Sequence, residues 1–361
     1  MRFMRVSITL VLMLFICVAI LSGSSVVKAQ QNDAASAIST AHAQLLQCFD
    51  AARAAESDGA NISSLTNVLN IAGGQLSNAE FAYSSGNFGL ASSLASQSQS
   101  SLGSFLPNAA ALKSSAVASS NHKTLIFVGS IVGTFVVIGA GVAVWVLVKR
   151  KYGNQAQKVS LRTFKVLFIL VIAILSLLVA SPALQRISIS PQTQFFTELS
   201  LLGPGHMAEN YPYNITSDQT YNIFLDIGNQ LGSVTYYQVE VKFRNETQFA
   251  PNEFNSTSSS QPSLCNFTAF VANQESFEIP ITFAFDFNYS FVNNFSQEQA
   301  NFNSLILNGA TLNLQGQTSI WAPQAHVFYG NLIFELWIYN STIGGFQYNN
   351  RSVSLVFNMT S

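Results

Sequence analysis

The sequence predicts a multi-domain membrane protein with an N-terminal α-helical bundle or hairpin, a two-helix transmembrane hairpin and a C-terminal all-β sandwich. Two uncharged apolar runs lie mid-chain. Apolar residues before them recur at helical spacing, and apolar residues after them alternate with polar ones. The expected boundaries are a signal peptide at 1–29, a helical domain at 30–122, spanning helices at 123–148 and 166–185 around a loop at 149–165, and a sandwich at 186–361.

The N-terminus has the features of a secretory signal. Arg2 and Arg5 provide a basic start, an apolar stretch follows at Leu10–Leu21, and Val27 and Ala29 occupy the −3 and −1 positions before Gln30. If cleavage does not occur, the segment becomes a third membrane helix with its N-terminus inside. In both cases we expect the residues that follow to be extracytoplasmic.

Residues 30–122 are expected to be helical, with breaks at Asp58–Asn61 and Ser84–Asn87 and a third helix over Phe88–Leu106 that Pro107 ends. The turn before Phe88 resembles the helical-hairpin turn of tetratricopeptide-type repeats, although a single copy makes no array. Residues 110–122 form a Ser/Ala-rich stalk. The apolar positions at helical spacing are Leu65, Val68, Leu69, Ala72, Leu76 and Ala79.

The membrane hairpin consists of Thr124–Val148 and a second uncharged run from Val166 to Gln185. At about 1.5 Å per residue, the first run covers the roughly 30 Å hydrocarbon core. Short loops rich in Lys and Arg stay in the cytoplasm, so both flanking domains are expected outside. Gly129 and Gly133 form a small-xxx-small pair that favours close helix packing. The loop between the runs has six basic residues and no acidic one: Lys149, Arg150, Lys151, Lys158, Arg162 and Lys165.

After residue 186 the pattern changes to strict alternation. It is clearest at Tyr221–Ile227 and Tyr237–Arg244, which turn residues separate. The segment Phe254–Pro262 is rich in Ser and Thr and is expected to be an exposed loop. Short strands with Gly/Asn/Ser turns and no intervening helix favour a β-sandwich. Further strands are expected at Phe277–Phe287, Leu305–Leu314, Val327–Tyr339 and Ser352–Phe357.

Charge is sparse: 48% of the residues are hydrophobic and only 9% are charged. From residue 186 onward there are twelve acidic and four basic residues, a formal balance of −8, which argues against nucleic acid as a partner. The basic loop is expected to lie near anionic lipid head groups of the bilayer. Cys48 and Cys265 lie in different expected domains, where two isolated thiols and a disulfide both remain open.

Glycosylation sequons support the same topology, since they imply exposure in a chain that meets a glycosylation machinery. None lies in the apolar runs or in the basic loop. Incidental matches in an Asn/Ser-rich sequence are the alternative. The candidates are Asn61, Asn214, Asn245, Asn255, Asn266, Asn288, Asn294, Asn340, Asn350 and Asn358.

A family resemblance begins with the run Phe196–Pro204, continues through Ala208–Pro212 and Asn214–Thr216, and includes Phe334–Trp337. These residues resemble the extracellular region of archaeal membrane proteins grouped as DUF1616, a family without an assigned activity. The resemblance covers about residues 195–361. It implies an archaeal surface protein with an immunoglobulin-like sandwich, and it supplies no catalytic residues.

No nucleophile elbow, phosphate loop, dinucleotide fingerprint or zinc signature is present, so no catalytic residue, cofactor or metal is predicted. His206 and His326 are expected to be surface or loop residues. Glu335 and Asp286, each between apolar neighbours in a strand, are expected to face solvent, although a carboxylate pair stays open. The aromatic residues Trp321 and Trp337 are core candidates that alternatively form a sugar-stacking platform.

These observations favour a membrane-anchored structural or interaction protein of the cell envelope, glycosylated and part of an assembly with envelope proteins or with itself. The alternatives are an adhesion or carbohydrate-binding module, which needs an exposed aromatic row, and an extracellular hydrolase, which needs Asp286, Glu335 and a histidine in one cleft. Because the two flanking domains emerge beside each other, we also expect them to be in contact.

Overall fold

The computed structural model describes residues 2–152, 160–186, 195–245, 247–252, 255–292, 297–322 and 328–360. The chain divides into two compact units. The mixed unit contains Met1–Ser57, Asn61–Ala111 and Gln194–Ser361, and therefore combines helices with the β-region. The hairpin unit contains Asp58–Ala60 and Leu112–Thr193. The chain thus leaves the mixed unit and later returns to it.

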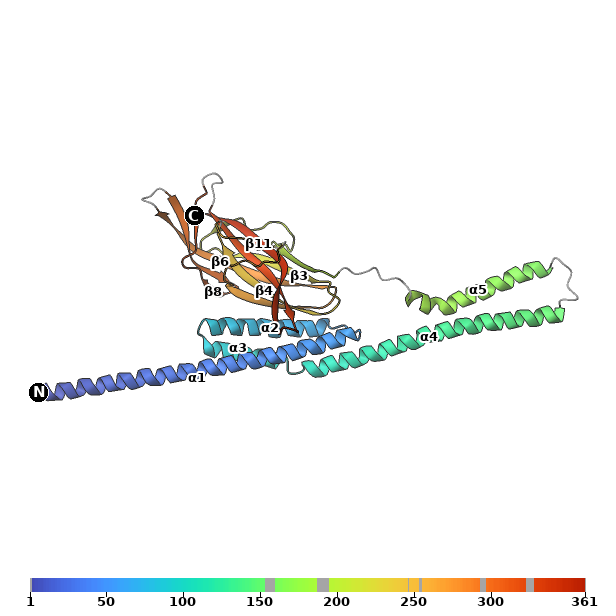
Figure 1. The fold of residues 1–361 in the computed structure, drawn as a ribbon, viewed down its shortest axis with the longest axis horizontal. Helices are drawn as coiled ribbons and strands as arrows, with labels where there is room; N and C mark the ends of the chain where they lie inside the picture. Colours follow the sequence, from blue (N-terminus) through green and yellow to red (C-terminus); the bar gives the residue numbers. More distant parts are fainter. Residues whose placement is uncertain are drawn as a thin grey trace. The chain divides into compact units, whose positions relative to one another are not determined.

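Three helices lie side by side in the mixed unit: α1 (Arg2–Ser57), α2 (Ser63–Ser84) and α3 (Phe88–Ser101) (Figure 1). Small side chains let them approach closely, and the buried Ser98 hydroxyl donates to the Ala72 carbonyl at 2.8 Å. The expected turn before α3 is confirmed, because the Asn87 side chain accepts from the Leu90 amide and caps that helix. Buried small residues include Ala34, Ala41, Ala52, Ala72, Ala79, Ala82, Ala91 and Ala95.

The predicted end of the third helix was wrong. Helix α3 ends at Ser101, and α4 begins at Phe105 and continues to Tyr152. Pro107 lies in the first turn of α4, where helix N–H groups have no intrahelical partner and proline therefore costs little. Proline starts a helix here instead of stopping one, and the Ser/Ala-rich stalk is part of α4.

The β-region is a sandwich of two sheets around one hydrophobic core. Sheet A has the order β1-β3-β6-β7-β8, with β9 also paired to β7, and sheet B has the order β2-β11-β10-β4-β5. The strands are β1 (Thr197–Leu202), β2 (Asn214–Thr216), β3 (Tyr221–Asn229), β4 (Thr235–Arg244), β5 (Cys265–Val271), β6 (Glu275–Val292), β7 (Gln297–Leu307), β8 (Ala310–Asn313), β9 (Thr318–Ile320), β10 (Tyr329–Asn340) and β11 (Gly345–Thr360).

Alternation located the strands of the core correctly: Ile223, Leu225 and Ile227 on β3 are all fully buried, as are Tyr237 and its inward neighbours on β4. Leu305–Leu314 is not one strand, because Asn308 and Gly309 have positive φ and turn the chain between β7 and β8. Sequence analysis missed β1, β2, β5, β9 and most of β7. These strands are short or rich in Asn, Gln and Ser, so their alternation is weak.

The expected contact between the helical segment and the sandwich is confirmed, since α2 packs against β5 within the mixed unit. A Cβ atom on Gly73 would lie only 2.9 Å from the Thr268 hydroxyl, so glycine permits this close approach. The Asn70 side chain donates to the Phe270 carbonyl at 2.9 Å and accepts from the Phe270 amide at 2.6 Å. Because β5 is the last strand of sheet B, this amide pairs with an otherwise open sheet edge.

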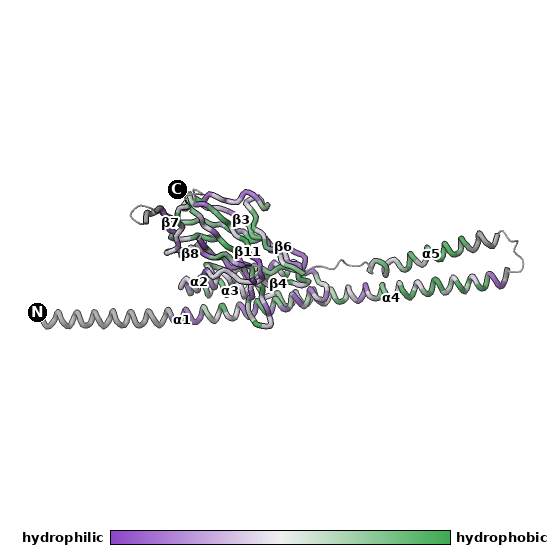
Figure 2. The backbone as a smooth tube through the Cα atoms, turned by 45° about the horizontal axis from the view of Figure 1, so that its top comes forward, coloured by the Kyte–Doolittle hydropathy of each residue, from purple (hydrophilic) through white to green (hydrophobic). Residues whose placement is uncertain are grey.

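In the hairpin unit, α4 packs against α5 (Ser160–Arg186). One described helical stretch, within Phe88–Leu147, is long and apolar enough to cross a membrane, and its apolar part belongs to α4; a shorter apolar helix covers Phe168–Pro182. Figure 2 shows both stretches as mainly hydrophobic. A Cβ on Gly141 would lie 2.5 Å from Ile172 Cδ1, and one on Gly133 would lie 3.1 Å from Val179 Cγ1. Glycine therefore sets the closeness of these helices.

Candidate functional site

The outer face of sheet B is covered by two different structures. At one end, Phe49 of α1 packs on a group of aromatic rings, with centroid separations of 5.7 Å to Phe270 and 6.1 Å to Tyr236. Tyr236 and Phe270 are themselves stacked at 4.1 Å. The Glu56 carboxylate fixes the end of α1 by accepting from the amides of Val234 and Asn273. The helices therefore close this end of the sheet.

At the other end lies an ionic cluster of Glu240 and Lys242 on β4 and Glu335 on β10. Lys242 Nζ is 2.8 Å from Glu335 Oε2 and 3.1 Å from Glu240 Oε2. It also donates to the Ser259 carbonyl at 3.0 Å, while the Ser259 amide donates to Glu335 Oε1 at 2.5 Å. Ser259 therefore links the segment between β4 and β5 to the cluster.

The ionic cluster is a closed structural element. Lys242 has three N–H donors, and each has an acceptor, so no donor remains for a substrate. Glu335 is fully buried, which overturns the prediction that it faces solvent. The reason is that β10 lies inside sheet B and the Ser259 segment covers its outer side. Ser259 is also buried, so the predicted exposed loop is wrong at this residue.

Trp337 adjoins the cluster, with its ring centroid 5.9 Å from Lys242 Nζ and 5.7 Å from the Tyr348 ring. A register shift at Leu336/Trp337 accompanies the positive φ of Asn350 on the paired strand β11. Trp337 is half-buried on the outer face of the sheet. Trp321, in contrast, packs against Phe328 at 4.9 Å at the margin of the sandwich core. The two tryptophans therefore form no common aromatic row.

The residues required by the hydrolase alternative do not converge. Asp286 lies on β6 in sheet A, accepts a hydrogen bond from Asn303 and alternates with core phenylalanines, whereas Glu335 is on the outer side of sheet B. Packed sheets are about 10 Å apart, and both carboxylates point away from the core. His206 pairs with Glu278 at 2.7 Å and stacks on Phe224. His326 is outside the described residues.

The outer face of sheet A has acidic side chains on β1, β3 and β6, where His206 covers part of the face by its contacts with Glu278 and Phe224. Glu198 and Glu278 are exposed, and Asp226 lies between them on β3. Burial raises the pKa of Asp226, and the charges of Glu278 and Glu198 add to this effect, while a hydrogen bond with Ser276 opposes it. Among the described residues, no group of three or more His, Cys, Asp or Glu side chains could hold a metal ion.

An open depression of about 380 Å³ lies between α1 and α2. Its lining residues are Ala35, Ile38, Ser39, His42, Glu80 and Tyr83. Burial lowers the pKa of His42 from its ordinary value of 6.5 and raises that of Glu80 from 4.5. Both shifts favour the neutral forms. This polar pair was not singled out in the sequence.

The candidate glycosylation sites differ in their surroundings. Asn255 is exposed in a turn, whereas the Asn245 side-chain nitrogen donates to the Thr318 carbonyl at 2.7 Å. The Asn61 oxygen accepts from the Ser63 amide and hydroxyl. Asn294 is outside the described residues. The remaining candidates are on strands or their ends: Asn214, Asn266, Asn288, Asn340, Asn350 and Asn358.

The two cysteines for which a disulfide was one alternative, Cys48 and Cys265, are free thiols. Cys48 is fully buried in α1, and Cys265 is half-buried on β5. Burial raises their pKa values to about 11 and about 12.

Sequence reasoning missed Lys242, Glu240 and Ser259, which make the cluster, and Asn70 and Glu56, which join helices to sheet. One signal was present for the cluster. Glu335 stands in the apolar segment Leu332–Leu336 of a long strand, a setting typical of a strand buried on both faces, where a charge needs a partner. No local signal marks Asn70, because its partner is 200 positions away.

These features define the class of protein: a two-sheet β-sandwich with a helical layer on one sheet, joined in one chain to a unit of long apolar helices. More particularly, residues 190–290 match the family described as "Domain of unknown function (DUF1616)". The match confirms the resemblance over that stretch and supports a DUF1616-type protein. Comparison with curated proteins gives no match.

Solved structures with distant similarity include a β-glucosidase from Listeria innocua in complex with glucose, at 6% identity and a TM-score of 0.23, covering 46% of this chain and 16% of that one. The CARDB domain of a Pyrococcus furiosus protein in complex with di-metal ions has 10% identity and a TM-score of 0.21, covering 48% of this chain and 97% of that domain. The chain thus spans less than one fifth of the β-glucosidase. Scores this low support no functional transfer.

Proposed function

We propose that this chain is a membrane-anchored surface protein whose helices and sandwich form one extracytoplasmic interaction unit held by a two-helix transmembrane hairpin. The proposal includes a cleaved or uncleaved N-terminal signal, an immunoglobulin-like sandwich, surface glycans and a place in an archaeal envelope assembly. The DUF1616 match is consistent with it but has no assigned activity.

One observation carries the proposal. The segments before and after the apolar helices belong to the same compact unit, as the Asn70–Phe270 and Glu56–Asn273 contacts demonstrate. Segments that pack together must lie on the same side of a membrane. An even number of crossings between them meets this requirement. In this proposal α4 provides one crossing and the shorter apolar helix of α5 provides the second.

The charge distribution supports the sidedness. The loop between the helices has six basic residues and no acidic one, which favours the cytoplasm. The mixed unit is then extracytoplasmic. Its partner-binding surface is the acidic outer face of sheet A, because helices and the Ser259 segment cover much of the outer face of sheet B. A partner with a basic surface fits this face.

Membrane-impermeant maleimide labelling tests the topology. Cysteine is introduced at Ile343, which is 57% exposed in the turn between β10 and β11, or at Gln155 in the basic loop, with the native cysteines replaced by alanine. We expect Ile343→Cys to label in intact cells and Gln155→Cys to label only after permeabilisation. Labelling of both in intact cells, or the reverse pattern, would contradict the proposed topology.

Carbohydrate binding is a second candidate because Trp337 lies half-buried beside Tyr348 on the outer face of sheet B, a pairing suited to stacking on a sugar. Glycan-array binding that Trp337→Ala abolishes and Trp321→Ala leaves intact would favour this function. Equal loss in both variants would indicate damage to the sandwich, and no binding by the unsubstituted protein would remove the candidate.

A further inference from the structure

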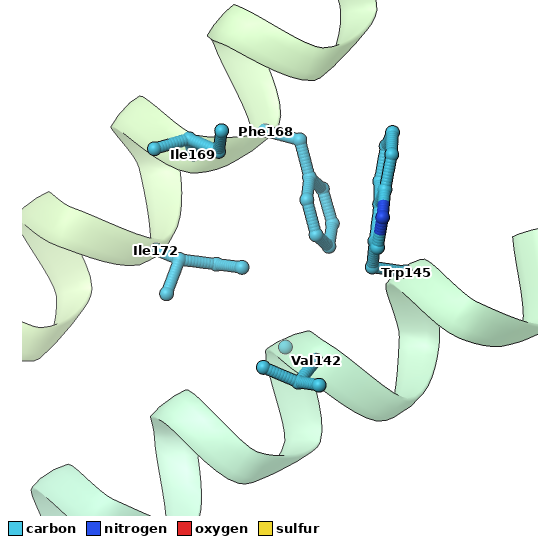
Figure 3. A pocket seen from close by; sticks show the side chains of 6 residues that line it. Val142, Trp145, Phe168, Ile169 and Ile172 are labelled. Carbon is cyan, nitrogen blue, oxygen red and sulfur yellow. The ribbon is translucent and has the colours of Figure 1, made fainter. Parts of the chain in front are cut away.

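A groove between the two apolar helices is the feature with the clearest ligand chemistry. Figure 3 shows its walls: Val142 and Trp145 from α4, and Phe168, Ile169 and Ile172 from α5. The groove also borders Gly141 and has a volume of about 270 Å³. Val142 and Ile169 are 57% and 67% exposed, so it is open to the surroundings of the helices.

The groove arises from the packing of the helices. At Gly141 the absence of a side chain lets Ile172 approach the α4 backbone. One turn further along α4, the rings of Trp145 and Phe168 face each other with centroids 5.9 Å apart, and they separate the helices. The groove lies between α4 and α5, where the close approach at Gly141 gives way to the wider separation at Trp145 and Phe168. Its apolar lining offers little to hold water.

The charge beside the groove indicates the occupant. Lys149 follows Trp145 after four residues and Arg150 after five, and both are exposed. At about 1.5 Å per residue they lie about 6 Å and about 7.5 Å further along the helix. On α5, Lys165 precedes Phe168 by three residues. The intervening loop contains no acidic residue. An apolar groove with Lys149 and Arg150 just beyond its Trp145 wall matches a lipid with an acyl chain and an anionic head group.

We propose that this groove binds one anionic phospholipid, with an acyl chain against Trp145 and Ile172 and the phosphate beside Lys149 and Arg150. A second copy of the chain fits less well, because it would bring another six positive charges to the same end of the hairpin. The proposal rests on the transmembrane hairpin proposed above. It goes further by naming a ligand class and a bound stoichiometry.

Native mass spectrometry of the full chain in detergent, titrated with phosphatidylglycerol or phosphatidylcholine, tests the site. We expect one phosphatidylglycerol to be retained in preference to phosphatidylcholine. Lys149→Gln combined with Arg150→Gln is expected to weaken this binding about thirtyfold, since each cation near an anionic lipid contributes about a factor of five. Equal retention of both lipids, or no loss in the double variant, would overturn the proposal.

A matched pair of variants tests the groove itself. Val142→Phe fills it and is expected to reduce phosphatidylglycerol binding without changing charge. Val136→Phe is the control, because Val136 is 63% exposed on the same helix and does not line the groove. Equal binding by both variants would refute the acyl-chain contact, as would a dimer that only Val142→Phe dissociates.

Membrane association separates this proposal from the one on which it depends. If the chain is extracted from membranes by alkaline carbonate, both proposals fail. If it resists extraction but has no preference for phosphatidylglycerol, the lipid site alone fails.

Discussion

Replacement of Asn70 by alanine should weaken the contact between helices and sandwich. In the native protein the Asn70 amide completes both backbone groups of Phe270, by hydrogen bonds of 2.9 Å and 2.6 Å. Alanine leaves the N–H and C=O of Phe270 without these partners in a half-buried contact. Each hydrogen bond contributes about 1 kcal/mol net, and incomplete rehydration adds to the loss, so the expected cost is about 2–3 kcal/mol.

Thermal unfolding of the full chain in detergent, at one fixed scan rate, measures the effect. For a unit of this size a loss of 2–3 kcal/mol corresponds to a decrease in Tm of about 5 °C. Hydrogen exchange gives a local readout, because the Phe270 amide should be protected only while Asn70 is present.

Asn67→Ala is the matched control. Asn67 is exposed and borders the same contact, but no side-chain hydrogen bond joins it to the described part of the sheet, so its replacement should change stability by no more than about 0.5 kcal/mol. If Asn70→Ala and Asn67→Ala have the same Tm and the Phe270 amide stays protected, the amide does not stabilise the sheet edge and the reasoning is wrong.

Three further predictions follow from the described contacts. Lys242→Met should lower the free energy of unfolding, measured by chemical denaturation, by about 3–5 kcal/mol because it leaves the buried Glu335 carboxylate without its cation. Adding Glu335→Leu should recover part of that loss, and a double variant less stable than Lys242→Met would contradict this. The pKa of His42 is lowered from 6.5 in the folded state, so the unfolded chain binds more protons and the free energy of unfolding should fall as the pH decreases through 6.5. His42→Asn should make the free energy of unfolding, measured between about pH 7.5 and 5, less dependent on pH. In a glycosylating host, Asn255→Gln should increase gel mobility and Asn245→Gln should not, because the Asn245 nitrogen already donates to a carbonyl; an unchanged band for Asn255→Gln would count against the exposed site.

Periodicity predicted the interior of the fold well. The stripe Leu65, Leu69, Ala72, Leu76 and Ala79 is buried as helical spacing requires, and β3 and β4 direct their alternate residues into the core. Both patterns arise because one face of an element is buried along its whole length.

The outer faces could not be read in the same way. Alternation in β4 is the pattern of a strand with one face in solvent, but Lys242 on the polar face is buried by a segment that follows the strand. Whether a polar face is covered depends on where a loop folds back, and alternation within the strand contains no information on this. The same limit applies to Trp337, whose setting depends on a register shift on β11.

The end of α3 and the start of α4 also differ from the sequence-based prediction. The sequence predicts that Pro107 ends a helix, yet the residue occupies the first turn of α4. Proline is compatible with a helix start and incompatible with a helix interior, so the same residue supports opposite boundaries. Here the turn at residues 102–104 determines the boundary.

The 200 positions that separate Asn70 from Phe270 have a consequence for biogenesis. At 5–20 residues per second, synthesis of the intervening chain takes roughly 10–40 s. Throughout that time the face of α2 that contains Gly73 has no sheet to cover it, and on the proposed topology both spanning helices must insert before β5 is made. On that topology the helical segment is translocated but only partly buried until β5 has been synthesised. A chaperone outside the membrane would find its substrate at this stage.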